Sequence, residues 1–165
     1  MSATMKNKDH PDTSEEASRL LQRAYSLKGN AEAQELYAAW AKTYDQTMLD
    51  ELGYLTPKRT AQLLGQHVQT RSSKVLDVGS GTGLAGMELS QLSFMSIDGL
   101  DYSPEMLEVA KSRDIYDSLI KADLNLPLGI ESVTYDALIC TGTFTHAHVG
   151  AGCLPKLFRI LKPGG

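Results

Sequence analysis

Three glycines, Gly79, Gly81 and Gly83, alternate with small polar residues two positions after the acidic residue Asp77. Glycine lets the backbone approach a bound molecule closely, because it has no side chain and adopts positive φ without strain. Where such a loop joins a strand to a helix, the helix also offers free N–H groups and the positive end of its dipole. A strand-to-helix turn without a ligand rarely needs three glycines, so the segment predicts a nucleotide-derived ligand.

The residues around the glycines indicate which nucleotide this is. A nicotinamide dinucleotide site requires G-x-G-x-x-G or G-x-G-x-x-A, and Leu84 occupies the position of the last small residue. The carboxylate of Asp77 would repel a pyrophosphate, whereas it suits a ligand that carries an ammonium group. The pattern D-x-G-x-G-x-G therefore favours such a ligand, and a nicotinamide-dependent oxidoreductase is the weaker alternative.

Two further acids follow apolar runs that we interpret as strands. Asp101 lies 24 residues after Asp77, and its carboxylate could accept hydrogen bonds from both ribose hydroxyls of a nucleoside. Asp123 follows the next run, where a carboxylate could accept from an adenine amino group. Because the carboxyl ends of parallel strands line the ligand crevice of an open α/β sheet, we expect the three acids to lie near one site.

Strand-like and helix-like segments alternate from residue 74 onward. The predicted strands are residues 74–78, 94–100, 118–122 and 135–141, and the predicted helices are residues 82–92, 103–111 and 152–161. This alternation is typical of β-α-β units around a mostly parallel sheet. The sequence therefore predicts an α/β fold, with a Rossmann-like doubly wound sheet.

The chain divides into three parts on these patterns. Residues 1–18 are predicted to be a disordered polar tail, residues 19–70 a helical region, and residues 71–165 the core with the sheet. Within the helical region we expect one helix at 31–52 and another at 56–68.

Composition narrows the class of protein. The 165 residues carry a net charge of −4, so composition does not favour nucleic acid as a partner, although it leaves room for a local basic groove. No apolar stretch approaches the about 20 residues of a membrane span, and the N-terminus lacks the apolar segment of a signal peptide. Cys140 and Cys153 have no C-x-x-C partner, so we expect free thiols, no metal site and a cytoplasmic protein.

Four motifs make the sequence recognisable: YAAWAKTYD at 37–45, VLDVGSGTG at 75–83, GLDYSPEML at 99–107 and LKPGG at 161–165. On these motifs the chain resembles class I S-adenosylmethionine-dependent methyltransferases, and more narrowly the Williams–Beuren syndrome region methyltransferase-like family. The resemblance covers most of the chain from about residue 31. It implies that the cofactor is S-adenosylmethionine and that the region 19–70 forms a cap over it.

The resemblance also implies a role for each candidate residue. Gly79, Gly81 and Gly83 would pack against the methionine part of the cofactor, with Asp77 nearby, and Thr141 would approach the same part. The residues that would hold the adenosine part are Asp101 at the ribose, Tyr102 and Met106 beside the adenine, and Asp123 with the Leu124 backbone at the adenine edge. Trp40 or Tyr44 would reach the cofactor from the cap, or would only pack in its core.

Methyl transfer from a sulfonium depends mainly on orientation, so a general base is needed only if the acceptor arrives protonated. His146 and His148 are candidates for that base, although two histidines in a polar loop are more often structural. As a metal pair they lack further nearby ligands. We expect a small-molecule acceptor ahead of a protein acceptor, and a non-catalytic cofactor-binding or regulatory form is the alternative from another class.

The family sheet has seven strands in the order 3-2-1-4-5-7-6, and the predicted segments of this chain supply the first four. We therefore expect the sequence to stop before the sheet is complete, at the LKPGG turn of residues 161–165. The part beyond this turn would normally carry much of the acceptor pocket.

Overall fold

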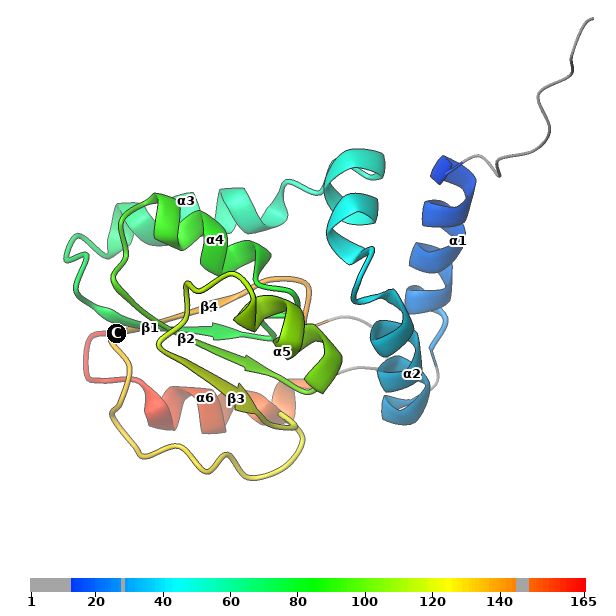
Figure 1. Ribbon diagram of the computed structural model, residues 1–165. Helices are drawn as coiled ribbons and strands as arrows, with labels where there is room; N and C mark the ends of the chain where they lie inside the picture. The colour runs from blue at the N-terminus through cyan, green and yellow to red at the C-terminus, as the bar shows by residue number, and fades with distance from the viewer. Residues whose placement is uncertain (1–12, 28, 145–148) are drawn as a thin grey trace, which may run out of the picture.

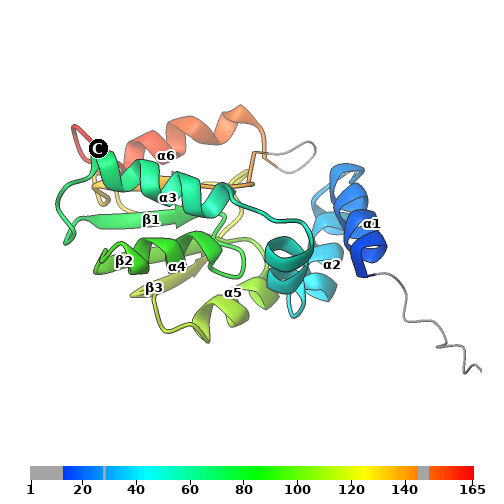
Figure 2. The ribbon, with the colours of Figure 1, turned by 90° about the horizontal axis from the view of Figure 1, so that it is seen from above.

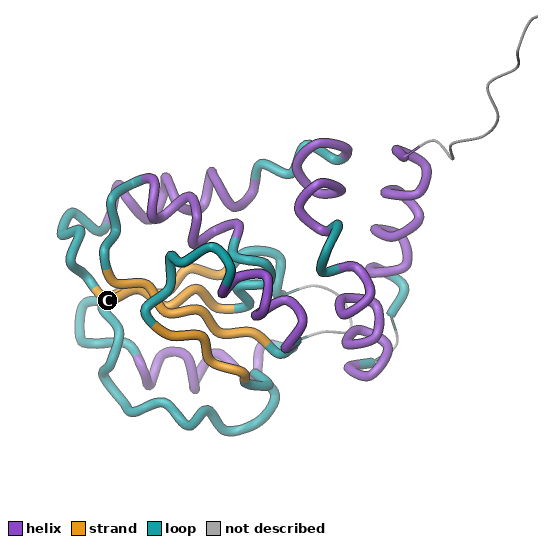
Figure 3. The backbone as a smooth tube through the Cα atoms, in the orientation of Figure 1, coloured by secondary structure: helices purple, strands orange, loops and turns teal. Residues whose placement is uncertain are grey.

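The computed structural model describes residues 13–27, 29–144 and 149–165, and these contain one parallel sheet. Its strands are β1 (Lys74–Val78), β2 (Ser96–Asp101), β3 (Ser118–Lys121) and β4 (Ala137–Cys140). They lie in the order β3-β2-β1-β4 at the centre of the molecule (Figure 3). All three pairs of neighbours are parallel, so the predicted α/β class and the order of the first four strands are confirmed.

Both faces of β1 are buried, because successive side chains of a strand point to opposite sides of the sheet. Leu76 and Val78 pack into one apolar cluster with Leu157 and Ile160. Val75 packs into a second cluster on the other face of the sheet. A strand that is covered on both faces reads as a continuous apolar run, which explains why the sequence predicted this strand with its correct bounds.

Helices cover the two faces of the sheet unequally (Figures 1 and 2). One face carries α3 (Thr56–His67), α4 (Leu84–Gln91) and α5 (Pro104–Lys111). The other carries α6 (Leu154–Ile160), which follows a short 3₁₀ turn at Ala151–Cys153. The predicted start of α5 is confirmed, since the Ser103 hydroxyl oxygen accepts a hydrogen bond from the Met106 N–H at 3.3 Å.

The N-terminal region contains α1 (Thr13–Tyr25), α2 (Asn30–Trp40) and a π-helical segment, η1 (Gln46–Glu51). The predicted tail 1–18 was wrong for residues 13–18, which belong to α1. Ala17 and Ala24 lie on one buried side of this helix and Leu27 follows it into the same core. The alanines gave little apolar signal in a charge-rich segment, so the sequence analysis missed the helix.

The single helix predicted over 31–52 was also wrong, because the chain turns after Trp40 and resumes as η1. The Thr43 N–H donates to the Trp40 carbonyl at 3.0 Å, which tightens the backbone into a turn. Beyond the turn the Leu52 N–H donates to the Thr47 carbonyl, a spacing of five residues. The turn directs Tyr44 and Asp45 toward the sheet.

The N-terminal helices stand beyond the carboxyl ends of the strands, as the arrowheads in Figures 1 and 2 show. The last residue of the chain lies at the opposite end of the sheet (Figure 1). Over the described parts of the chain, no helix is both long enough and apolar enough to cross a membrane.

Candidate functional site

A cavity opens between the carboxyl ends of the strands and the N-terminal helices. It encloses about 880 Å³, a volume that includes solvent at its open mouth. The predicted site residues that line it are Tyr44, Gly79, Gly81, Asp101, Tyr102, Met106, Asp123, Leu124 and Thr141. Three other predicted residues, Trp40, Asp77 and Gly83, are not among those that line it.

The loop after β1 owes its glycines to two different needs. Gly79 and Gly81 adopt φ of 71° and 54°, in the left-handed region that favours glycine. A Cβ on Gly79 would lie 2.0 Å from the Thr143 hydroxyl oxygen, so this glycine makes room for the loop after β4. A Cβ on Gly81 would meet nothing within 4 Å, so this glycine keeps the cavity open for a ligand.

Gly83 and the nearby Gly86 make room for side chains that follow α5 in the sequence. Gly83 adopts φ of 96°, and a Cβ on it would lie 3.1 Å from both Arg113 and Tyr116 side chains. A Cβ on Gly86 would lie 2.2 Å from the Tyr116 hydroxyl. The third glycine of the sequence motif therefore serves packing between α4 and the connection from α5 to β3, not contact with the cavity.

Asp77 is fully buried on the α4 side of the sheet. Its Oδ2 accepts hydrogen bonds from the Gly86 N–H (3.1 Å) and the Tyr116 hydroxyl (2.8 Å). Burial, and secondly the Asp101 carboxylate, raise the pKa of Asp77 to about 7, although its two hydrogen bonds act in the opposite direction. Asp77 thus lies at the N-terminus of α4, where the helix dipole and these hydrogen bonds offset part of the cost of burying the carboxylate.

Asp101 lines the cavity at the end of β2, where its carboxylate also shapes the glycine loop. Its Oδ2 accepts from the Gly81 N–H and its Oδ1 from the Ser103 N–H, each at 2.8 Å. Burial raises the pKa of Asp101, while these N–H donors act to lower it. Each carboxylate oxygen retains a further lone pair, so the group can accept hydrogen bonds from a ligand in the cavity.

The residues predicted for the adenosine part of the cofactor lie at the ends of β2 and β3. Tyr102 and buried Met106 come from the start of α5, and Asp123 and Leu124 follow β3. The Asp123 carboxylate accepts from the Asn125 N–H at 2.8 Å, which fixes the turn that brings it to the cavity. This wall combines apolar surface with carboxylate acceptors, as an adenine ring requires.

Three aromatic residues of the cap pack against one another, and two of them reach the cavity. Trp40 contacts Tyr44 edge to face, with ring centroids 4.9 Å apart, and stacks at 6.2 Å on Tyr37. Tyr37 and Tyr44 line the cavity, while Trp40 is buried behind them. Of the two alternatives for these side chains, the structure places Tyr44 at the cavity and Trp40 in the core of the cap.

The two tyrosines that the cap contributes to the cavity, Tyr37 and Tyr44, have raised pKa values and keep their protons at neutral pH. Burial, with the nearby Asp101 carboxylate as the next cause, raises the pKa of Tyr37 to about 12. Burial also raises the pKa of Tyr44. Their hydroxyls can therefore donate hydrogen bonds to an anionic or polar ligand group, but they cannot act as phenolate bases.

The loop after β4 forms the remaining wall. Thr141 lines the cavity, and the Thr143 hydroxyl donates to the Val78 carbonyl at 3.1 Å, which fastens this loop to the end of β1. Burial raises the pKa of the Cys140 thiol, so the thiol is not an activated nucleophile. His146 and His148, the predicted candidates for a general base, lie outside the described residues.

Sequence reasoning missed several residues of the cavity wall, among them Gln34, Tyr37, Asn125 and Thr143. For two of them a signal existed in the sequence. Gln34 precedes Tyr37 by three residues within α2, which is a spacing of one helix face. Asn125 and Thr143 lie in loops and carry no comparable pattern.

The glycine loop has few N–H groups left to bind a pyrophosphate, because other groups of the chain already accept hydrogen bonds from them. The N–H groups of Gly79 and Ser80 both donate to the Leu100 carbonyl, at 2.7 and 2.9 Å. Two further N–H groups are bound by the carboxylates of Asp77 and Asp101. A dinucleotide would thus bring negative charge close to the Asp101 carboxylate on the loop and the Asp77 carboxyl group on the following helix, whereas a cationic ligand would be attracted.

Comparison with known proteins points to one family. The family described as "Methyltransferase domain" matches residues 75–165. The chain is 33% identical to human methyltransferase-like protein 27 over 145 residues, which are 86% of the chain and 58% of that protein. It is 30% identical to the demethylmenaquinone methyltransferase of Tropheryma whipplei, over 84% of the chain and 58% of that protein. The chain thus spans less than two thirds of the length of these relatives.

Solved structures show the same fold. A Haloferax volcanii protein solved in complex with the Trm112 methyltransferase activator is 28% identical, with a TM-score of 0.63. The alignment covers 78% of this chain and 57% of that one. A Methanococcus maripaludis protein that is 19% identical matches 96% of this chain and 64% of its own, with a TM-score of 0.57.

Proposed function

The chain belongs to the methyltransferase domain family, among the class I S-adenosylmethionine-dependent enzymes, and we propose that it transfers the methyl group of that cofactor to a small-molecule acceptor. The observation that carries the proposal is the bonding of the glycine loop. Asp77 and Asp101 already bind N–H groups of the loop and the helix that follows. S-adenosylmethionine fits this arrangement because it carries a sulfonium and an ammonium group and no phosphate.

We propose that the cofactor lies along the ends of β1, β2 and β3. The adenosine part contacts the wall formed by Tyr102, Met106 and Leu124, with the ribose hydroxyls on Asp101 and the adenine amino group on Asp123. The methionine part extends over Gly79 and Gly81 toward Thr141. This placement is supported by the lining of the cavity, because acceptors for hydroxyl and amino groups stand on one side and small residues on the other.

When bound, the cofactor supplies an electrophilic methyl group that an acceptor lone pair can attack in line. The protein contributes orientation and exclusion of water, which together can account for much of the rate. Tyr37 and Tyr44 close the cavity from the cap side and hold their protons at neutral pH, so they act as donors that orient ligand groups. A proton released by the acceptor would go to another group, and His146 and His148 are our candidates.

A small acceptor is favoured because residues of the N-terminal helices and of the strand ends line one common cavity. A protein acceptor is the second candidate within the same reaction. Both cysteines among the described residues, Cys140 and Cys153, are free, which supports a reducing compartment. We therefore place the protein in the cytoplasm.

Isothermal titration calorimetry of the full-length protein with S-adenosylhomocysteine and with NAD tests the cofactor. We expect saturable binding of S-adenosylhomocysteine and no heat of binding with NAD. The reverse pattern would overturn the proposal. Transfer of label from methyl-labelled S-adenosylmethionine to candidate acceptors then separates an enzyme from a protein that only binds the cofactor.

A further inference from the structure

The cap is joined to the glycine loop by three polar residues that the cavity does not include. Asp45 comes from the turn after α2, Thr82 from the glycine loop, and Arg113 from the connection between α5 and β3. Asp45 Oδ1 accepts from the Thr82 hydroxyl at 2.5 Å. Asp45 Oδ2 forms an ion pair with the Arg113 guanidinium. We name these three residues the clasp.

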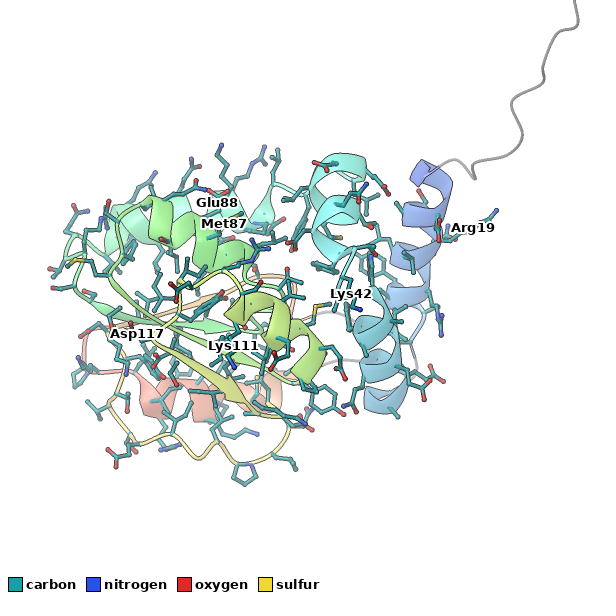
Figure 4. The ribbon with its side chains drawn as sticks, viewed as in Figure 1. Arg19, Lys42, Met87, Glu88, Lys111 and Asp117 are labelled. Carbon is teal, nitrogen blue, oxygen red and sulfur yellow. The ribbon has the colours of Figure 1, made fainter. Side chains whose placement is uncertain are left out.

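The clasp closes on itself, because Arg113 also binds the loop directly. Its Nε donates to the Thr82 carbonyl at 2.6 Å, so each of the three residues contacts the other two. A second guanidinium nitrogen of Arg113 donates to the sulfur of Met87 at 3.4 Å, and Met87 is labelled on α4 in Figure 4. Each of the three guanidinium nitrogens of Arg113 thus donates a hydrogen bond to the loop, the following helix or the cap.

Burial makes this arrangement stronger than a surface ion pair. The Thr82 side chain is almost fully buried, and the Arg113 and Asp45 side chains are 18% and 32% exposed. Hydrogen bonds to charged groups in such a setting gain more than exposed pairs, which are screened by water and salt. Behind the clasp, Leu84 of α4 packs in the apolar cluster of the cap with Trp40.

Gly83 is an independent sign that the chain is built around the clasp. This glycine stands directly after Thr82 in a left-handed conformation, and a Cβ there would lie 3.1 Å from the Arg113 side chain. A side chain there would be strained at this φ and would move the Arg113 side chain by a few tenths of an ångström. Glycine at this position therefore allows Arg113 to lie close to the loop.

We propose that the clasp is a positioning device that couples closure of the cap to the cofactor-binding form of the glycine loop. Asp45 directly follows Tyr44, which lines the cavity, and Thr82 directly follows Gly81, which lines it from the opposite side. Fixing Asp45 to Thr82 therefore fixes the spacing between two walls of the cavity. The inference rests on the proposed function, because it assigns these residues to the same cofactor.

Coupling of this kind has a defined consequence for binding. A ligand that contacts both walls binds the closed form, and its apparent affinity falls with the fraction of molecules that are closed. Loss of the clasp lowers that fraction and lets the ligand leave through the opened cap. The dissociation rate constant should therefore rise, although the residues that contact the ligand are unchanged.

Thr82→Val and Thr82→Ser form the matched test in the full-length protein. Valine keeps the shape of the buried side chain and removes the hydroxyl that Asp45 accepts from, whereas serine keeps the hydroxyl. We expect Thr82→Val to weaken S-adenosylhomocysteine binding about 10-fold through faster dissociation, and Thr82→Ser to remain within about 3-fold of wild type. In hydrogen exchange, the ligand should protect α2 and η1 in wild type and not in Thr82→Val, with the sheet equally protected in both.

The outcomes separate the clasp from the proposed function. A wild-type protein that does not bind S-adenosylhomocysteine overturns the proposed function and this inference with it. Normal affinity of Thr82→Val, or equal losses in both Thr82 variants, overturns the clasp alone. If Thr82→Val does not fold, Asp45→Asn decides, with exposed Asp50→Asn of the same segment as its control. Faster dissociation of the ligand from Asp45→Asn but not from Asp50→Asn supports the clasp. Equal dissociation rates from these two variants overturn it.

Discussion

Replacing Asp77 with asparagine changes the charge of a fully buried group and almost nothing of its shape. The retained oxygen can still accept from the Gly86 N–H and the Tyr116 hydroxyl, which now bind Oδ2. The amide nitrogen takes the place of Oδ1, a buried atom with no hydrogen-bond partner among the described residues. Asparagine therefore removes the carboxylate and keeps the two hydrogen bonds that cap α4.

The effect on stability depends on pH. Burial raises the pKa of Asp77 from the ordinary 3.8 to about 7 in the folded protein, so the folded state favours the protonated group. The contribution of this group to stability is complete below about pH 4 and is lost as the pH rises toward 7. The full difference corresponds to about 4 kcal/mol, of which about 2–3 kcal/mol falls between pH 5 and pH 8. Asparagine has no such loss.

Urea unfolding of both proteins between pH 5 and pH 8 measures this difference. Relative to wild type, Asp77→Asn should gain about 2–3 kcal/mol in free energy of unfolding from pH 5 to pH 8. Exposed Asp117→Asn is the control and should parallel wild type. Parallel profiles for Asp77→Asn would refute the reasoning. So would a large loss of S-adenosylhomocysteine affinity without any change in stability, because Asp77 would then contact the cofactor.

Five further substitutions test the wall of the cavity and the candidate base. Asp101→Ala should weaken S-adenosylhomocysteine binding about 10- to 100-fold in calorimetry, and an unchanged dissociation constant would show that it does not hold the ribose. Gly79→Ala should unfold at lower temperature by far more than Gly81→Ala, because its Cβ meets a side chain at 2.0 Å whereas that of Gly81 meets only the cavity. Gly81→Ala should still lose cofactor affinity, and equal melting temperatures would contradict the assignment of the two glycines. His146→Ala and His148→Ala should each lower turnover with cofactor affinity unchanged. A variant that loses turnover and cofactor affinity equally would point to a role in cofactor binding instead.

The two central strands, β1 and β2, were predictable from sequence because they are buried on both faces. Such strands read as apolar runs, and the glycine loop and the Ser103 cap mark the junctions with the helices. The order of the four strands followed from the resemblance and is the observed one. The carboxyl ends of parallel strands meet at one edge of the sheet, so acids that follow these strands lie close together. Asp101 and Asp123 reach the cavity in this way.

Side-chain direction at Asp77 was not predictable in the same way. A strand that is apolar on both faces does not reveal which face carries which helix, so the carboxylate could have pointed to either side. The contacts of Arg113 were equally hidden, because Asp45 is 68 residues away from it in sequence. Local periodicity carries no information about such pairs, and the turn after Trp40 that makes the contact depends on them.

We propose that S-adenosylmethionine binds between the cap and the carboxyl ends of the strands, with its ribose on Asp101. Asp77 lies behind the glycine loop and binds groups of the protein, not the cofactor. A crystal structure of the full-length protein with S-adenosylhomocysteine tests this placement most directly. The account predicts both ribose hydroxyls within hydrogen-bond distance of the Asp101 carboxylate, and Asp77 still bonded to Gly86 and Tyr116. A ligand bound elsewhere, or its amino group directly on the Asp77 carboxylate, would contradict the account.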